Sequence, residues 1–207
     1  AAGRTDAGVH AVAQVAHFKT ESDIPSVGIM KGVNSLLPDD IAIVAAEDVS
    51  LDFHSRKDAK SKRYLYRILL CDQRMPLFAE RVWHLNGGLD LAAMKDASGC
   101  LIGINDYESF RAAGCSSGHA IREITSIEFS SSKEDWQTGG QGELIEITFE
   151  GTGFVRHMIR NIVGTLIEVG RGKIDANEVS RILDEKNRQV AGICAPACGL
   201  YLVAVCY

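Results

Sequence analysis

Apolar residues recur every three or four positions in several stretches of the chain, and this spacing predicts amphipathic helices. The strongest example spans residues 154–170, FVRHMIRNIVGTLIEVG. The side chains expected to form its buried stripe are Val155, Met158, Ile159, Ile162, Val163, Leu166 and Ile167. Shorter stretches of the same kind predict helices at 26–37, 90–103 and 176–186.

Short apolar runs, several of them alternating with polar residues, predict strands between these helices. The predicted strands are 12–18, 41–49, 64–70, 124–129, 144–149 and 200–207. The polar, glycine-containing stretch 130–143 is expected to join two of them as a long hairpin.

The order of these elements indicates an α+β fold built from ferredoxin-like units. From residue 53 onward the predicted order is β-α-β-β-α(α)-β, which is typical of a split β-α-β domain. We therefore expect residues 53–207 to form a complete ferredoxin-like domain. Residues 1–52 are expected to be the rear part of a first such domain, truncated at its N-terminus.

Composition adds few constraints beyond a globular, intracellular protein. The 207 residues are 46% hydrophobic and 24% charged, enough for one large or two small domains. The six cysteines include no Cys-x-x-Cys pair, so we expect reduced thiols and no metal site. No apolar run approaches the roughly 18 residues of a membrane span, and no signal peptide is visible. The cytoplasm is the expected location, with an organelle left open because the chain begins with Ala1 and looks cut.

The charge of the chain is unevenly distributed. Its net charge of −5 argues against a nucleic-acid partner, but residues 56–63 carry a local net charge of +4. The basic residues of this run are Arg56, Lys57, Lys60, Lys62 and Arg63. The run is either a solvated surface or a strip that contacts phosphates in a salt-sensitive way.

Asp6 is the first candidate for chemistry, because it lies between glycines in GRTDAG. In one interpretation it is a turn residue whose carboxylate accepts backbone N–H groups. In the other, Gly3 and Gly8 keep side chains away so that a bulky substrate can approach the carboxylate. Arg4 could then contact phosphate or hold open the gap left by a flipped base.

A second cluster lies on the predicted helix 154–170. His157, Arg160, Asn161 and Gly164 are spaced to share one face of it. Arg160 either extends its guanidinium to the surface or reaches Asp6 and keeps that carboxylate ionised. His157 is a further candidate for RNA binding.

Two tyrosines follow the basic run on a predicted strand. Tyr64 and Tyr66 share one face, where they either pack in the core or stack on an unpaired base.

Six segments together resemble the tRNA pseudouridine synthase I family. They are GRTDAGVHA, GVNSLLPDDI, FHSRKDAKSKRYLYRI, FRAAGCSS, FVRHMIRNIVGTLIEVG and GLYLVAVCY. The match runs through the whole chain in the family's order. Members carry a strand and a helix before the first of these motifs, so we expect this chain to be a fragment of a longer product.

The resemblance implies two ferredoxin-like domains with their sheets side by side around a central RNA-binding cleft. It implies an isomerase that converts uridine to pseudouridine at positions 38 to 40 of the tRNA anticodon stem-loop. The family acts without metal or organic cofactor and usually as a homodimer.

The resemblance also assigns roles to individual residues. Asp6 matches the catalytic aspartate, Tyr64 the tyrosine that packs on the target base, and Arg160 the basic partner of the aspartate. Arg4 matches an arginine implicated in base flipping, and Leu200 an apolar residue lining the pocket.

Two rival functions are weighed against this one. A non-catalytic RNA-binding fragment would keep the basic run and use Asp6 only as a turn residue. An aspartate-nucleophile hydrolase normally needs a second carboxylate for magnesium, as in Asp-x-Asp, and TDAGVH has none.

Overall fold

A mixed sheet of seven strands forms the centre of the molecule. The computed structural model describes residues 1–115, 117–136 and 140–207. The strands are β1 (His10–Ala11), β2 (Ser61–Leu70), β3 (Trp83–Leu85), β4 (Gly103–Asp106), β5 (Ile121–Trp136), β6 (Gly140–Gly151) and β7 (Leu200–Cys206). Their order across the sheet is β1-β7-β2-β6-β5-β4, with β3 paired to one end of β2. The β1–β7 and β2–β3 pairs are parallel and the others antiparallel.

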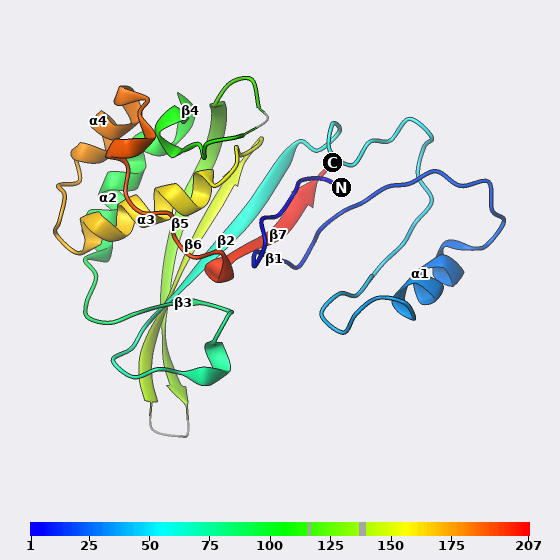
Figure 1. Ribbon diagram of the computed structural model, residues 1–207, viewed down its shortest axis with the longest axis horizontal. Coiled ribbons are helices and arrows are strands. Elements are labelled where there is room, and N and C mark those ends of the chain that lie inside the picture. The colour runs from blue at the N-terminus through cyan, green and yellow to red at the C-terminus, as the bar shows by residue number, and fades with distance from the viewer. Residues whose placement is uncertain (116, 137–139) are drawn as a thin grey trace.

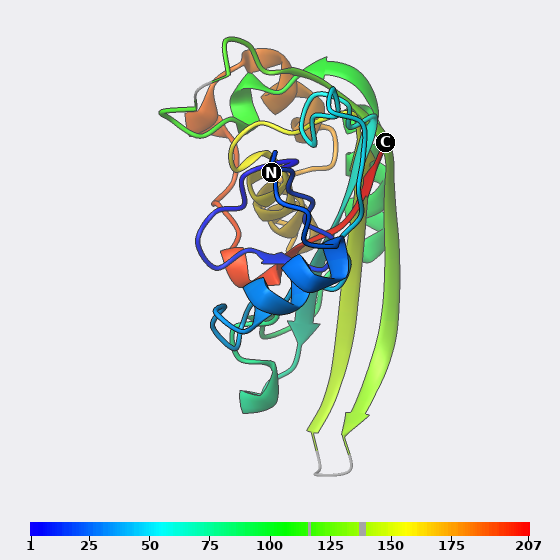
Figure 2. The same ribbon diagram turned by 90° about the vertical axis from the view of Figure 1, so that its right-hand side faces the viewer.

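Three of the four α-helices in the described residues cover one face of this sheet (Figures 1 and 2). They are α2 (Leu91–Ser98), α3 (Met158–Gly170) and α4 (Glu178–Glu185). α2 begins where predicted, because the Asp90 carboxylate caps it by accepting a 2.9 Å hydrogen bond from Ala93 N–H. In the described part of the chain, no helix is long and apolar enough to cross a bilayer.

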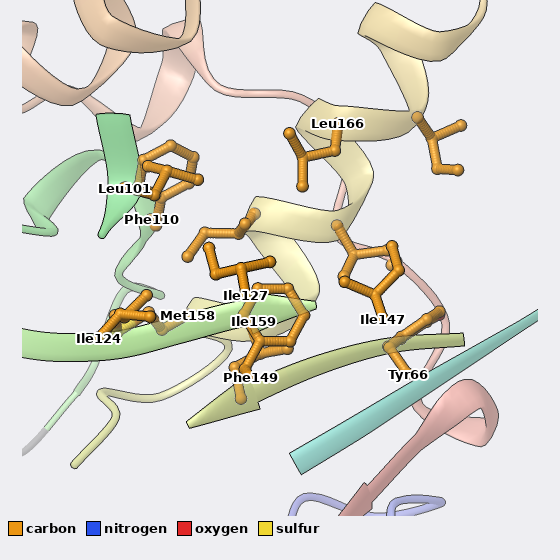
Figure 3. Close-up of a cluster of buried hydrophobic side chains, with 14 of the residues drawn as sticks. Tyr66, Leu101, Phe110, Ile124, Ile127, Ile147, Phe149, Met158, Ile159 and Leu166 are labelled. Atoms are coloured by element: carbon orange, nitrogen blue, oxygen red, sulfur yellow. The ribbon is translucent and has the colours of Figure 1, made fainter. Parts of the chain in front are cut away.

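The core lies between α3 and the sheet (Figure 3). Every residue of the stripe predicted for 154–170 is buried. Tyr66, Ile147 and Phe149 from the sheet belong to the same cluster as Ile159 and Leu166 from the helix. The helical spacing therefore identified the face that α3 buries.

Gly164 allows a loop to pass directly against α3. A Cβ atom at this position would lie 1.7 Å from the carbonyl oxygen of Ile193. The segment 191–196 therefore packs on the helix backbone, and this brings Cys194 and Ala195 to the first turn of α3.

The predicted strands 12–18 and 41–49 are wrong. Among the described residues, 12–60 contain no strand, and their one helix, α1 (Ser26–Asn34), has no buried residue. Figure 1 shows this segment projecting on the side of β1 and β7, away from α2, α3 and α4. Its apolar side chains are largely exposed, including Val12, Phe18, Ile24, Val27, Leu36, Ile41, Val44 and Leu51. An apolar run becomes a strand only beside a partner strand, and these runs have none here.

Other boundaries differ less. β5 and β6 are much longer than predicted and extend beyond the other strands (Figure 2), so most of the predicted loop 130–143 is strand. Residues 137–139 of that loop lie outside the described residues. The chain thus has a multi-stranded sheet and four helices in its described part. The two ferredoxin-like domains, 1–52 and 53–207, stay a prediction.

Candidate active site

The loop that carries Asp6 is fastened to the sheet on both sides. After Asp6, a turn closes with Val9 N–H donating to the Asp6 carbonyl over 3.0 Å, and β1 then pairs with β7. Gly8 makes this turn with φ of 79°, in the left-handed region that favours glycine. Before Asp6, Lys62 Nζ donates to the Ala2 carbonyl over 2.9 Å. The short loop between these anchors holds the aspartate over the end of β2.

Three cationic or basic side chains surround the Asp6 carboxylate. Nε2 of His157 lies 3.2 Å from Oδ2, and Nη1 of Arg160 lies 3.5 Å from the same oxygen. Nε of Arg156 lies 3.9 Å from Oδ1. The Asp6 side chain is 30% exposed, so the carboxylate is held by these groups and still open to a ligand. Three groups that can carry positive charge thus face one carboxylate.

Arg160 does not extend to solvent; it reaches Asp6. Its side chain is 14% exposed, and its Nε donates to the Ala195 carbonyl over 2.7 Å. Ala195 N–H donates back to the Arg160 carbonyl over 3.1 Å. This reciprocal pair fixes the guanidinium beside the carboxylate.

His157 is just outside the helix on which it was predicted. α3 begins at Met158, and His157 precedes it with φ of 60° and ψ of 3°. Its side chain is 25% exposed, with Nδ1 lying 3.8 Å from Cys194 Sγ. Asn161, predicted on the same face, is instead buried and donates to the Phe110 carbonyl over 2.8 Å.

Tyr64 lies in the wall of the site. It is 9% exposed, and its ring meets Phe154 edge to face with 5.2 Å between ring centroids. A Cβ at Gly3 would lie 3.9 Å from its hydroxyl oxygen, so the Asp6 loop passes over it. Burial, with a smaller effect of the charge on Asp6, raises the pKa of Tyr64 to about 12. Tyr64 therefore carries a neutral hydroxyl at physiological pH.

Tyr66 and Leu200 are core residues. Tyr66 is fully buried and donates its hydroxyl to the Pro196 carbonyl over 2.7 Å. Leu200 pairs with Tyr66 in the sheet register and is 7% exposed. The structure thus places Leu200 in the core beside the site.

The structure divides the basic run between the two faces of the sheet. Lys62, on the same face of β2 as Tyr64, contacts the Asp6 loop, and burial followed by the charge of Arg56 lowers its pKa. Arg56, Lys57 and Lys60 are exposed in the preceding turn. Arg63 points to the opposite face, where its Nη2 lies 2.8 Å from Glu150 Oε2. Arg4, two residues before Asp6, is exposed.

Two arginines near the site were missed from the sequence. Arg156 contacts Asp6, and its position next to His157 in the VRHMIR segment was the available signal. Arg122 donates to Ser117 Oγ over 2.7 Å. Burial lowers the pKa of Arg122; Cys115 opposes this, and the nearby charges of Arg111 and Arg56 add to it. Arg122 lies on β5, and no local sequence pattern indicates that β5 comes close to the turn that carries Arg56.

The chemistry available is that of one carboxylate. In the described part of the chain, no group of three or more His, Cys, Asp or Glu side chains is placed to hold a metal ion. An ionised, partly open carboxylate beside a neutral tyrosine can act as a nucleophile or a base.

Comparison with known proteins identifies the family. A model described as tRNA pseudouridine synthase matches residues 97–207. The tRNA pseudouridine synthase A of Thermoanaerobacter sp. (strain X514) is 43% identical over 206 residues, covering 100% of this chain and 81% of that protein. The protein of the same name from Myxococcus xanthus is 42% identical, covering 100% of this chain and 75% of its own length. The chain therefore belongs to the tRNA pseudouridine synthase family of isomerases.

Proposed function

We propose that the chain converts uridine to pseudouridine at positions 38 to 40 of the tRNA anticodon stem-loop, with Asp6 as the catalytic residue. The observation that carries this proposal is the Asp6 carboxylate, 30% exposed and within 4 Å of His157, Arg156 and Arg160. The family that the chain belongs to supplies the reaction class.

The reaction breaks the bond between ribose C1′ and uracil N1 and makes one between C1′ and C5. The proton on C5 is lost and N1 gains one, so no oxidant, reductant or cofactor is consumed. Asp6 serves this exchange by adding to the sugar or the base, or by removing a sugar proton. For each of these roles Arg156 and Arg160 lie beside the carboxylate and attract its negative charge.

The neighbouring residues keep the detached uracil in place. Tyr64 presents a ring beside the loop of Asp6, suited to packing on a base that has left its stack. Leu200, which pairs with Tyr66, is proposed as the apolar residue behind this pocket. Flipping the uridine costs a few kcal/mol, and we propose that Arg4, an exposed residue of the Asp6 loop, occupies the gap.

Phosphate contacts are proposed for the basic residues on the Asp6 side of the sheet. Arg4, Arg56, Lys57, Lys60 and Lys62 form this set, and Arg122 and Arg156 extend it. Arg63 is left out because it pairs with Glu150 on the opposite face. Charge neutralisation of this kind makes tRNA affinity fall steeply with salt.

We also propose a homodimer, supported by the exposed apolar side chains of residues 12–51. Light scattering should give twice the chain mass of 22.4 kDa, and a single-chain mass would contradict it.

The decisive experiment maps pseudouridine in an unmodified tRNA by carbodiimide-stop sequencing after incubation with the chain. Asp6→Asn keeps the size of the side chain and removes its charge, so product should disappear while tRNA binding persists. Asp96→Asn, at an exposed position on α2, is the matched control and should leave product formation unchanged. Binding without product in the unmutated chain would favour the non-catalytic RNA-binding alternative.

A further inference from the structure

His157 lies between a thiol and the Asp6 carboxylate. Its Nδ1 is 3.8 Å from Cys194 Sγ, and its Nε2 is 3.2 Å from Asp6 Oδ2. Its φ of 60° lies in the left-handed region, which residues other than Gly adopt uncommonly and in which His, like Asn and Asp, is enriched. Such a backbone persists where surrounding contacts hold it, often at functional sites.

The protonation of the three groups follows from their partners. An ionised carboxylate can only accept, so Nε2 of His157 carries the proton and donates it to Asp6. A neutral ring then offers Nδ1 as an acceptor, and a thiol can donate to it. Burial raises the pKa of Cys194, which keeps it as a thiol at neutral pH. The same sulfur also lies 3.8 Å from the Ala195 carbonyl oxygen, a second acceptor.

Burial and three arginines around His157 favour its neutral form, and the charge of Asp6 opposes them. It is faced by Asp6 from the N-terminal loop, Arg156 and Arg160 around the start of α3, and Arg188 and Cys194 from the segment after α4. Burial is the first cause that lowers the pKa of His157; the three arginines lower it further, and Asp6 raises it.

We propose that His157 is a positioning residue for Asp6: the Cys194 thiol fixes the tautomer of the ring, and the Nε2–H of the ring fixes the orientation of the carboxylate. This goes beyond the RNA-binding role predicted for His157 and rests on the proposed function of Asp6. Protonating the ring puts a hydrogen on Nδ1 against the thiol and adds another positive charge beside the carboxylate. The working form is therefore the neutral imidazole.

The test measures single-turnover pseudouridine formation between pH 5 and 8 at saturating enzyme, together with the enzyme concentration that gives half the maximal rate. In the unmutated chain the rate should fall at acid pH, with a midpoint below the ordinary histidine value of about 6.5. His157→Gln places an amide N–H close to the position of Nε2 and does not titrate. His157→Gln should keep the rate at pH 7 within about tenfold of the unmutated rate. The fall in rate at acid pH that the unmutated chain shows should be absent or smaller in this variant.

Further variants separate positioning from structure. His157→Ala should lower the rate about 10- to 100-fold, the loss typical of one hydrogen bond to a charged group. Cys194→Ser keeps a donor and should stay near the unmutated rate, whereas Cys194→Ala should lower it a few-fold. His84→Gln, on β3 and bonded to the Cys71 carbonyl, is the matched control and should keep the acid fall. Thermal melting checks that each variant is folded.

Asp6→Asn distinguishes a failure of the proposed function from a failure of the positioning role of His157. If Asp6→Asn retains activity, the proposed function fails. If Asp6→Asn is inactive but His157→Gln keeps the acid fall unchanged, the positioning role of His157 is overturned. If His157→Ala raises the enzyme concentration that gives half the maximal rate and leaves the maximal rate unchanged, His157 is instead a tRNA contact and the positioning role is overturned.

Discussion

Replacing Gly164 with Ala should damage stability and activity together, because this glycine sets the distance between α3 and the segment 191–196. The added Cβ would lie 1.7 Å from the Ile193 carbonyl oxygen, whereas real contacts stay above 3.0 Å. The carbonyl must therefore retreat by roughly 1.3 Å. Ala195, two residues further on, would move with it and lose its reciprocal hydrogen bonds with Arg160.

The size of the effect can be worked from these contacts. Overpacking of this kind costs about 1–3 kcal/mol, and each lost hydrogen bond about 1 kcal/mol. The higher helix propensity of alanine offsets about 1 kcal/mol of this destabilisation. We expect Gly164→Ala to lower the free energy of unfolding by about 3 kcal/mol, measured by urea titration. The single-turnover rate should fall at least tenfold, because Arg160 loses its anchor.

A matched substitution provides the control. Gly32 lies within α1, is exposed, and would place its Cβ with nothing within 4 Å. Gly32→Ala should therefore be neutral or stabilising by up to about 1 kcal/mol. If the free energy of unfolding of Gly164→Ala lies within about 0.5 kcal/mol of the value for the unmutated chain, the close packing of 191–196 on α3 is refuted. A destabilised variant with an unchanged rate would refute the coupling of that segment to the site.

Two further predictions concern pH and salt. Because the pKa of Tyr64 is raised to about 12, its contribution to stability is complete below pH 10, the unfolded value, and is lost as the pH rises towards 12. Urea titrations from pH 9 to 12 should thus show a smaller alkaline loss for Tyr64→Phe; an equal loss would contradict the burial of this hydroxyl. Arg122→Ala should weaken tRNA binding and reduce the slope of log affinity against log salt by about 1, whereas Arg63→Ala should leave the slope unchanged. Equal effects of the two substitutions would show that both faces of the sheet contact tRNA.

Local patterns in the sequence predicted what depends on local contacts. The stripe from Val155 to Ile167 identified the buried face of α3, and Asp90 marked the start of α2. The start of α3 was misplaced, because the left-handed backbone of His157 has no signature in the spacing of apolar residues.

Long-range contacts were less accessible. The runs at 12–18 and 41–49 have the composition of strands, but pairing needs a neighbour that composition does not reveal. The contact between Asp6 and Arg160 was one of two open interpretations, since the two residues are 154 positions apart. Arg156 falls outside the i, i+3, i+4 spacing that groups His157 with Arg160 and Asn161, so that pattern does not indicate it.

The parallel pairing of β1 with β7 has a consequence for synthesis of the protein. His10 pairs with Tyr201, and at 5–20 residues per second these two residues leave the ribosome about 10–40 s apart. Throughout that interval the loop of Asp6 has no sheet edge to join, and Arg160 has no Ala195 to hold it. We therefore expect a nascent chain that lacks β7 and Ala195 to lack the arrangement of Asp6 and Arg160 proposed for the reaction.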